Sequence, residues 1–214
     1  MDTQLLKARV QELVERDWNP AEIEARYVKL MREGIPRGVP NRDDIISRKE
    51  EFLDRVQLRA EEYGYLSHSC PKGSALALFE QFGMGSVEFI KALSPFPGLG
   101  MTGWTCGAVT GGLIVIGTYF GSDDIVNYEA NGRAIAAART FLPRFEAELG
   151  SILCPRIQED VIFGTYMDPR SSQENFEAFV KAEGYIKCAL PMGIGARLAA
   201  EVIIESMEEE GANR

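Results

Sequence analysis

The most informative stretch of this chain reads Gly98-Leu99-Gly100-Met101-Thr102-Gly103-Trp104-Thr105-Cys106-Gly107-Ala108-Val109-Thr110-Gly111-Gly112. It holds six glycines and one cysteine, and the apolar run Leu113–Phe120 follows it directly. Glycine inside a regular element costs about 0.5–1 kcal/mol relative to alanine, so this density of glycine needs a structural reason. Two interpretations are open. The stretch is either a turn before a tightly packed core helix, or a backbone that approaches a bound group, with Cys106 opening the helix.

Composition and charge narrow the class of protein. The chain has 214 residues, of which 45% are hydrophobic, and a formal net charge of −9. These values are typical of a globular protein with a substantial core. The negative charge argues against a nucleic-acid partner and against an anionic membrane surface. The longest apolar run is far shorter than a bilayer span of about 20 residues. With no signal-peptide pattern at the N-terminus, we expect a cytoplasmic location.

Apolar residues recur with helical periodicity along the chain, and no segment shows the strict alternation of a strand. We therefore predict an all-α fold, a multi-helix bundle with a glycine-rich loop and an N-terminal helical extension. The extension covers residues 1–65 with three helices, the last running from Asp43 or Asp44 to about Tyr63, and a four-cysteine helical domain covers residues 66–210. We expect the last helix to end near Met207 and the acidic tail after it to be frayed.

The four cysteines, Cys70, Cys106, Cys154 and Cys188, are dispersed along the second part of the chain and form no CxxC pair. Proline follows Cys70 and Cys154, so both are expected at helix starts, with Cys70 as the N-cap residue. The N-terminal end of a helix favours a thiolate over a thiol. Three chemistries remain open at this point: an iron–sulfur cluster, a structural zinc ion, or thiol/disulfide couples. Glycine N–H groups near a cluster would donate to its sulfurs, which makes Gly100, Gly103 and Gly107 candidate cofactor-binding residues.

The run Cys106-Gly107-Ala108-Val109-Thr110-Gly111 resembles the CGAxxG signature of a family of redox-active proteins with four cysteines, the C_GCAxxG_C_C family. The segment Arg144-Phe145-Glu146, followed by Gly150-Ser151 and Cys154, is similar to that family's RFE…GS…C segment. Over about residues 66–206, the resemblance implies a helical redox domain. It implies a 2Fe–2S or 4Fe–4S cluster on Cys70, Cys106, Cys154 and Cys188, with zinc or direct thiol chemistry as the alternatives. The expected partner is a redox protein or a small-molecule substrate, and the expected assembly is a homodimer.

Two further side chains lie close to the cysteines in the sequence. His68, the single histidine, precedes Cys70 by two residues. It is either a ligand, hydrogen-bond donor or proton carrier at the site, or an exposed loop residue. Trp104 precedes Cys106 by two residues and either shields the site from solvent or belongs to the core.

Overall fold

The last helix, α13 (Ala189–Ala212), runs through the middle of the protein in this computed structural model, which describes residues 2–38 and 40–212. Around it stand four helices that it contacts: α4 (Lys49–Ser67), α5 (Cys70–Phe82), α8 (Gly107–Phe120) and α9 (Tyr128–Leu149). Residues on every side of α13 are buried, among them Leu190, Ile194, Ala199 and Ile203. A helix that is apolar all round is a core helix, so α13 is the axis of the bundle.

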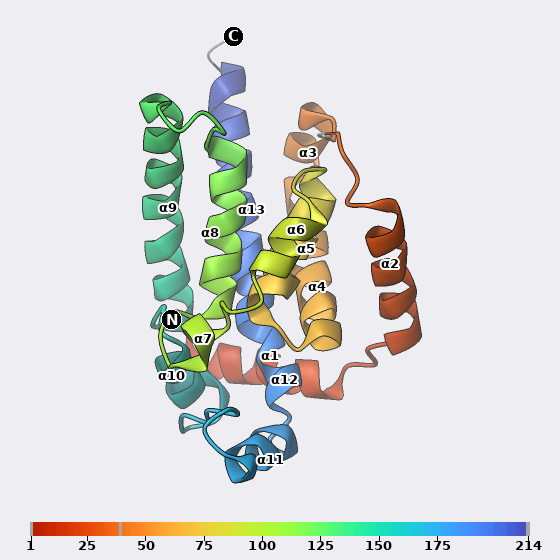
Figure 1. Ribbon diagram of the computed structural model, residues 1–214, viewed down its shortest axis with the longest axis vertical. Coiled ribbons are helices and arrows are strands. Elements are labelled where there is room, and N and C mark those ends of the chain that lie inside the picture. The colour runs from red at the N-terminus through yellow and green to blue at the C-terminus, as the bar shows by residue number, and fades with distance from the viewer. Residues whose placement is uncertain (1, 39, 213–214) are drawn as a thin grey trace.

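The long helices lie side by side, and Figure 1 shows α1 (Thr3–Glu15) crossing their lower end. Three short elements lie at this same end in both ribbon views: α7 (Gly98–Met101), α10 (Cys154–Ile157) and α12 (Gly184–Lys187). A π-helical turn, η1 (Gln158–Ile162), follows α10 directly, and α11 (Gln173–Lys181) lies below it. The lower end therefore gathers these short elements and the π-helical turn.

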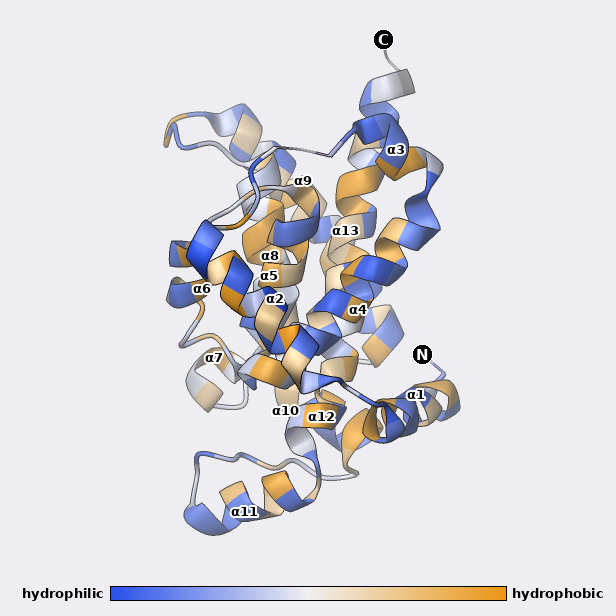
Figure 2. Cartoon of the chain, turned by 90° about the vertical axis from the view of Figure 1, so that its right-hand side faces the viewer, coloured by the Kyte–Doolittle hydropathy of each residue, from blue (hydrophilic) through white to orange (hydrophobic). Residues whose placement is uncertain are grey.

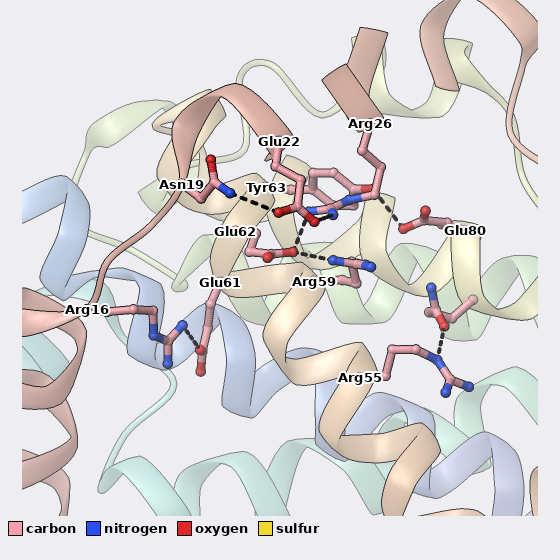
Figure 3. A network of polar contacts seen from close by, with 11 residues as sticks. Arg16, Asn19, Glu22, Arg26, Arg55, Arg59, Glu61, Glu62, Tyr63 and Glu80 are labelled. Atoms are coloured by element: carbon pink, nitrogen blue, oxygen red, sulfur yellow. Dashed lines mark hydrogen bonds and ion pairs between the residues drawn. The ribbon is translucent and has the colours of Figure 1, made fainter. Parts of the chain in front are cut away.

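Helix α2 (Pro20–Glu33) packs outside the bundle on α4. Figure 3 shows the polar network between them, in which Glu62 accepts from Arg26 at 2.5 Å and from Arg59 at 2.7 Å. Nearby, Arg16 reaches the buried carboxylate of Glu61 at 2.7 Å. The remaining helices, α3 (Arg42–Ser47) and α6 (Val87–Ala92), are short. The N-terminal helices are thus fastened to the bundle by charged side chains of α4.

The predicted all-α multi-helix fold is confirmed. Across residues 2–38 and 40–212 the structure has no β-strand, and an isolated antiparallel bridge joins Thr105 to Leu153. The helix predicted from residues 43–44 to about 63 is divided at Arg48, whose φ of −120° and ψ of 37° end α3 and start α4. The predicted fraying after Met207 is wrong, because α13 continues through the acidic residues. Lys49 binds Glu208 at 3.1 Å and holds that end of α13 against α4.

The predicted division of the chain near residue 65 falls inside α4, which runs without a break from Lys49 to Ser67. Helix α4 packs on α5 and α13, and Tyr63 donates a hydrogen bond to Glu80 of α5 at 2.8 Å. The division into residues 1–65 and 66–210 stays a prediction, and the packing of α4 gives no reason to place a boundary there.

Hydropathy separates the bundle helices from the outer ones. In Figure 2, α8 is largely hydrophobic, whereas α2 and α6 show hydrophilic and hydrophobic residues in turn. Helix α8 is nevertheless a short element of 14 residues. None of the helices described combines the length and the apolar composition that crossing a membrane requires.

Candidate functional site

All four cysteines lie where helices meet at the lower end of the bundle. Cys70 and Cys154 are the first residues of α5 and α10, Cys106 is the N-cap of α8, and Cys188 caps α12 immediately before α13. The predicted N-cap position of Cys70 is therefore off by one residue, because Ser69 takes it and the proline occupies the second helical position. All four are free cysteines.

The backbone pins Cys106 and Cys154 to each other. The N–H of Cys106 donates to the carbonyl of Ile152 at 2.8 Å, and the N–H of Cys154 donates to the carbonyl of Trp104 at 2.8 Å. Both cysteines start helices, whose first N–H groups have no partner inside the helix. The reciprocal pair satisfies one donor of each residue and fixes the two helix starts side by side.

Glycine brings α8 close to α5. A Cβ on Gly107 would lie 2.5 Å from Cδ of Pro71 and 2.9 Å from Cβ of Cys70, and a Cβ on Gly111 would lie 2.6 Å from the carbonyl oxygen of Pro71. Any side chain at these two positions would push the helices apart. The missing Cβ atoms thus place the start of α8, with Cys106, against Cys70.

The other glycines of the run have different tasks. Gly98 faces the site, because a Cβ there would lie 3.9 Å from Sγ of Cys154. Gly103 has a φ of +79°, and its Cβ would lie 3.2 Å from the hydroxyl of Tyr166. Gly100 has a φ of +77°, and a Cβ there would meet only Cγ2 of Thr102 at 3.9 Å, so it serves the turn rather than a close approach. Of the three candidate cofactor-binding glycines, Gly103 and Gly107 therefore border the site and Gly100 does not.

A cavity of about 50 Å³ lies beside three of the four cysteines, Cys70, Cys154 and Cys188. This volume is enough for roughly three to five water molecules. Its walls are mostly apolar and include Gly98, Met101 and Met192. Cys106 does not line the cavity and is only 4% exposed. The site therefore consists of one buried cysteine, Cys106, and three half-buried cysteines that border a partly open cavity.

Burial dominates the electrostatics of these thiols. It raises the pKa of Cys70 to about 12, with a further contribution from Cys154, while the backbone N–H groups of Cys70 and Gly107 oppose the shift. Burial raises the pKa of Cys106 and that of Cys188 well above the usual value, and Cys70 and Cys154 add to both shifts. The pKa of Cys154 is raised for the same reason. Backbone N–H groups at the helix starts do favour the thiolates of Cys70 and Cys106, as expected, but burial outweighs them and raises both pKa values.

His68 and Trp104 take positions that the sequence left open. His68 ends α4 with a φ of 51°, borders the same cavity and stacks on the ring of Tyr185, with centroids 4.1 Å apart. Partial burial lowers the pKa of His68, so the imidazole is neutral at pH 7. Trp104 is 62% exposed, which rules out a core position.

Two polar residues of the site were not identified from the sequence. Gln158 is 4% exposed, and its side-chain nitrogen lies 3.6 Å from Sγ of Cys154. Tyr166 borders the cavity, and burial raises the pKa of its hydroxyl, with contributions from Asp168 and Cys154. The spacing of Gln158 from Cys154, four residues on a helix, is a signal that would have placed it on the same face.

The arrangement of the thiols sets limits on what they bind. A tetrahedral zinc ion with Zn–S distances of about 2.3 Å needs its sulfurs within about 4 Å of one another. In the part of the chain that the structure describes, no group of three or more His, Cys, Asp or Glu side chains is arranged to hold a single metal ion. The four thiols nevertheless share one neighbourhood, since each of the other three contributes to the raised pKa of Cys188.

Comparison with known proteins identifies a protein family that this chain matches. A family model described as "Putative redox-active protein (C_GCAxxG_C_C)" matches residues 68–202, which include all four cysteines and the glycine run. The comparisons with curated proteins and with solved structures found no match. The match covers well over half of the chain and supports a redox role. The chain belongs to the C_GCAxxG_C_C family of redox-active proteins.

Proposed function

We propose that this chain is a redox protein that holds an iron–sulfur cluster through Cys70, Cys106, Cys154 and Cys188. The observation that carries the proposal is that the four cysteines stand at four different helix ends, that Cys70, Cys154 and Cys188 border one cavity, and that backbone hydrogen bonds hold Cys106 beside Cys154. No other cysteine exists in the chain. Four cysteine thiolates are the usual ligands of 2Fe–2S and 4Fe–4S clusters.

The four cysteines fit an iron–sulfur cluster better than they fit a single metal ion. A cluster extends over several atoms and therefore holds its sulfurs farther apart than a single ion does. The described side chains offer no single-ion site, yet the thiols lie close enough to shift one another's pKa. A cavity borders three of the four cysteines. These observations favour the cluster over the zinc alternative.

The chain also supplies backbone donors to the sulfurs. The backbone N–H groups of Gly107 and of Cys70 itself favour the charged form of Cys70 and lower its pKa, and those of Ala108 and Val109 do the same for Cys106. N–H donors stabilise negative charge on ligating sulfur and so raise the reduction potential of a bound centre. When bound, a cluster supplies one-electron chemistry. The chain would pass electrons to or from a partner protein or a small substrate.

The thiol/disulfide alternative finds less support in the geometry. Thiol exchange needs an accessible thiol with a substantial thiolate fraction near neutral pH. Burial raises the pKa of all four thiols, and Cys106 is almost fully buried. Binding to iron removes this obstacle, because a coordinating thiol is deprotonated by the metal's charge.

Anaerobic purification followed by absorption spectroscopy and by iron and sulfide analysis tests the proposal. We expect broad visible absorption that bleaches with dithionite, together with stoichiometric iron and sulfide. Replacing any one of the four cysteines by serine should lower the iron content strongly. Met101→Leu changes the cavity wall without removing a thiol and is the matched control, for which the iron content should stay unchanged.

Two outcomes contradict the proposal. A colourless protein with one zinc per chain would identify a structural zinc site. A metal-free protein whose titratable thiols double on reduction, from two to four, would identify a disulfide couple.

A further inference from the structure

Gln158 occupies an unusual place in the site. It is one of the few buried polar residues of the chain, with 4% exposure, and both ends of its amide have partners. Its oxygen accepts a hydrogen bond from the backbone N–H of Met167 at 2.8 Å. Its nitrogen lies 3.6 Å from Sγ of Cys154 and donates to that sulfur. The side chain therefore spans the gap between a cysteine of the site and a loop nine residues farther along.

The first of these bonds fixes the direction of the second. A backbone N–H only donates, so the group that faces Met167 has to be the amide oxygen. The NH₂ group then has to face Cys154, because the two groups lie at opposite sides of the amide. The orientation of the donor toward sulfur follows from the backbone of the loop and not from a choice between two equivalent rotamers.

The local backbone explains how one residue reaches both partners. Gln158 lies four residues after Cys154, which puts the two side chains on one face of the helical turn. A π-helical turn starts at Gln158, and the N–H of Phe163 donates to its carbonyl at 2.7 Å. Such turns occur often at functional sites. After this turn the chain returns, and Tyr166–Pro169 forms one wall of the cavity beside Cys154.

We propose that Gln158 is a positioning residue that clamps the cavity wall formed by residues 166–169 to the sulfur of Cys154. The inference rests on the proposed function for one of its two effects. As a donor to the Cys154 sulfur, the amide raises the reduction potential of a cluster held there. As an acceptor for Met167, it holds this wall beside Cys154 whether or not a cluster is bound.

Hydrogen exchange of the cofactor-free protein tests the clamp. Gln158→Met preserves the size of the side chain and removes both hydrogen bonds. The amide of Met167 should then exchange about three- to tenfold faster, the factor expected for one hydrogen bond of net strength. Exchange in α13 should not change, which shows that the fold persists. Gln57→Met is the matched control, since half-buried Gln57 donates to Glu61 at 3.1 Å on α4 and does not touch the cavity wall.

The reduction potential of the cluster-loaded protein tests the hydrogen bond from Gln158 to the sulfur of Cys154. It should fall in Gln158→Met and fall further in Gln158→Glu at pH 8, where a carboxylate replaces the donor with negative charge. The Glu variant keeps an acceptor for Met167, so its hydrogen exchange should remain slow. Gln158→Met should thus change both the exchange rate and the potential, whereas Gln158→Glu should change the potential alone. A purely structural role would not separate the two effects in this way.

The outcomes of the two measurements are distinguishable. Unchanged exchange at Met167 in folded Gln158→Met overturns the clamp. An unchanged potential in that variant overturns the role toward sulfur. If the wild-type protein binds no cluster, the proposed function fails, while the exchange experiment still decides whether Gln158 holds the cavity wall.

Discussion

At the level of single residues, the site depends on positions where a side chain is missing. Gly107 and Gly111 let α8 approach α5, and the first of them places Cys106 beside Cys70. Helix propensity alone would disfavour glycine at both positions, so their presence is a sign of packing that a propensity argument does not explain.

Gly107→Ala is therefore expected to lower stability by about 1–3 kcal/mol, as overpacking does in tight cores, and to lower iron content more than helicity. Gly117→Ala in the same helix is the matched control. No atom lies within 4 Å of the Cβ it would add, so the change should raise stability by about 0.5–1 kcal/mol. Urea denaturation and iron analysis measure both effects. Equal responses of the two variants would show that contact with Cys70 is unimportant.

Residue types near the cysteines were predictable from the sequence to an unequal degree. Proline after Cys70 and Cys154 identifies helix starts, and the structure has helices beginning there. The protonation state of the thiols was not predictable, since it depends on burial by residues distant in sequence. The exposure of Trp104 was equally hidden, because a tryptophan in a glycine-rich turn has no periodic pattern that marks its face.

At the level of elements, α1 and α2 are held to the bundle through α4. The carboxylate of Glu61 is buried against Gly193 of α13, and Arg16 is its charged partner at 2.7 Å. Arg16 also lies over the ring of Trp18, 4.7 Å from its centroid. One arginine thus connects the α1–α2 segment to α4 at a buried position.

Arg16→Met should destabilise the protein by about 2 kcal/mol, because Glu61 would lose its charged partner while remaining buried. Arg32→Met removes an ion pair between exposed side chains, Arg32 and Glu33 at 2.6 Å, and should change stability by less than about 0.5 kcal/mol. Chemical denaturation followed by circular dichroism compares the two. A similar small effect in both variants would contradict the anchoring role of Arg16.

Helix positions were largely predictable because apolar periodicity, proline and glycine mark most of them. The break at Arg48 was not, since the residues around it favour a helix and only the turn between α3 and α4 requires another backbone conformation. The stable end of α13 was also hidden. Its acidic residues suggest fraying, yet Lys49 from α4 and the contact of Arg42 with the carbonyl of Met207 hold them.

At the level of the whole molecule, the stability of this acidic protein depends on pH through Glu201 of α13, whose carboxyl group is costly to ionise in the folded state. Burial raises the pKa of Glu201, and Arg197 and Arg144 lower it without offsetting the burial. Just above pH 4.5, the carboxyl group of Glu201 is therefore still protonated in the folded state, whereas in the unfolded state it is mostly ionised. The resulting stability is fully present at lower pH and is lost as pH rises through the folded pKa.

Glu201→Gln should accordingly stabilise the protein at pH 7 and have little effect near pH 4. Arg197 keeps its contacts with Glu50 at 2.5 Å and Asp54 at 2.6 Å in this variant. Thermal unfolding of both proteins between pH 4 and 8 provides the comparison. A variant that is less stable than the wild type at every pH would show that the Arg197 contact with Glu201, at 3.4 Å, outweighs desolvation.

The four sulfurs come from helix junctions that are far apart in the sequence, and the last of them stands directly before the central helix. Such a site is complete only in a molecule whose bundle has closed, since no pair of neighbouring residues supplies two ligands. In a folding intermediate in which α13 has not yet packed on the other helices, the four cysteines would remain apart and form no site. For the proposed cluster, loading would therefore require a correctly folded bundle, and the visible absorption of a sample would measure its fraction of folded molecules.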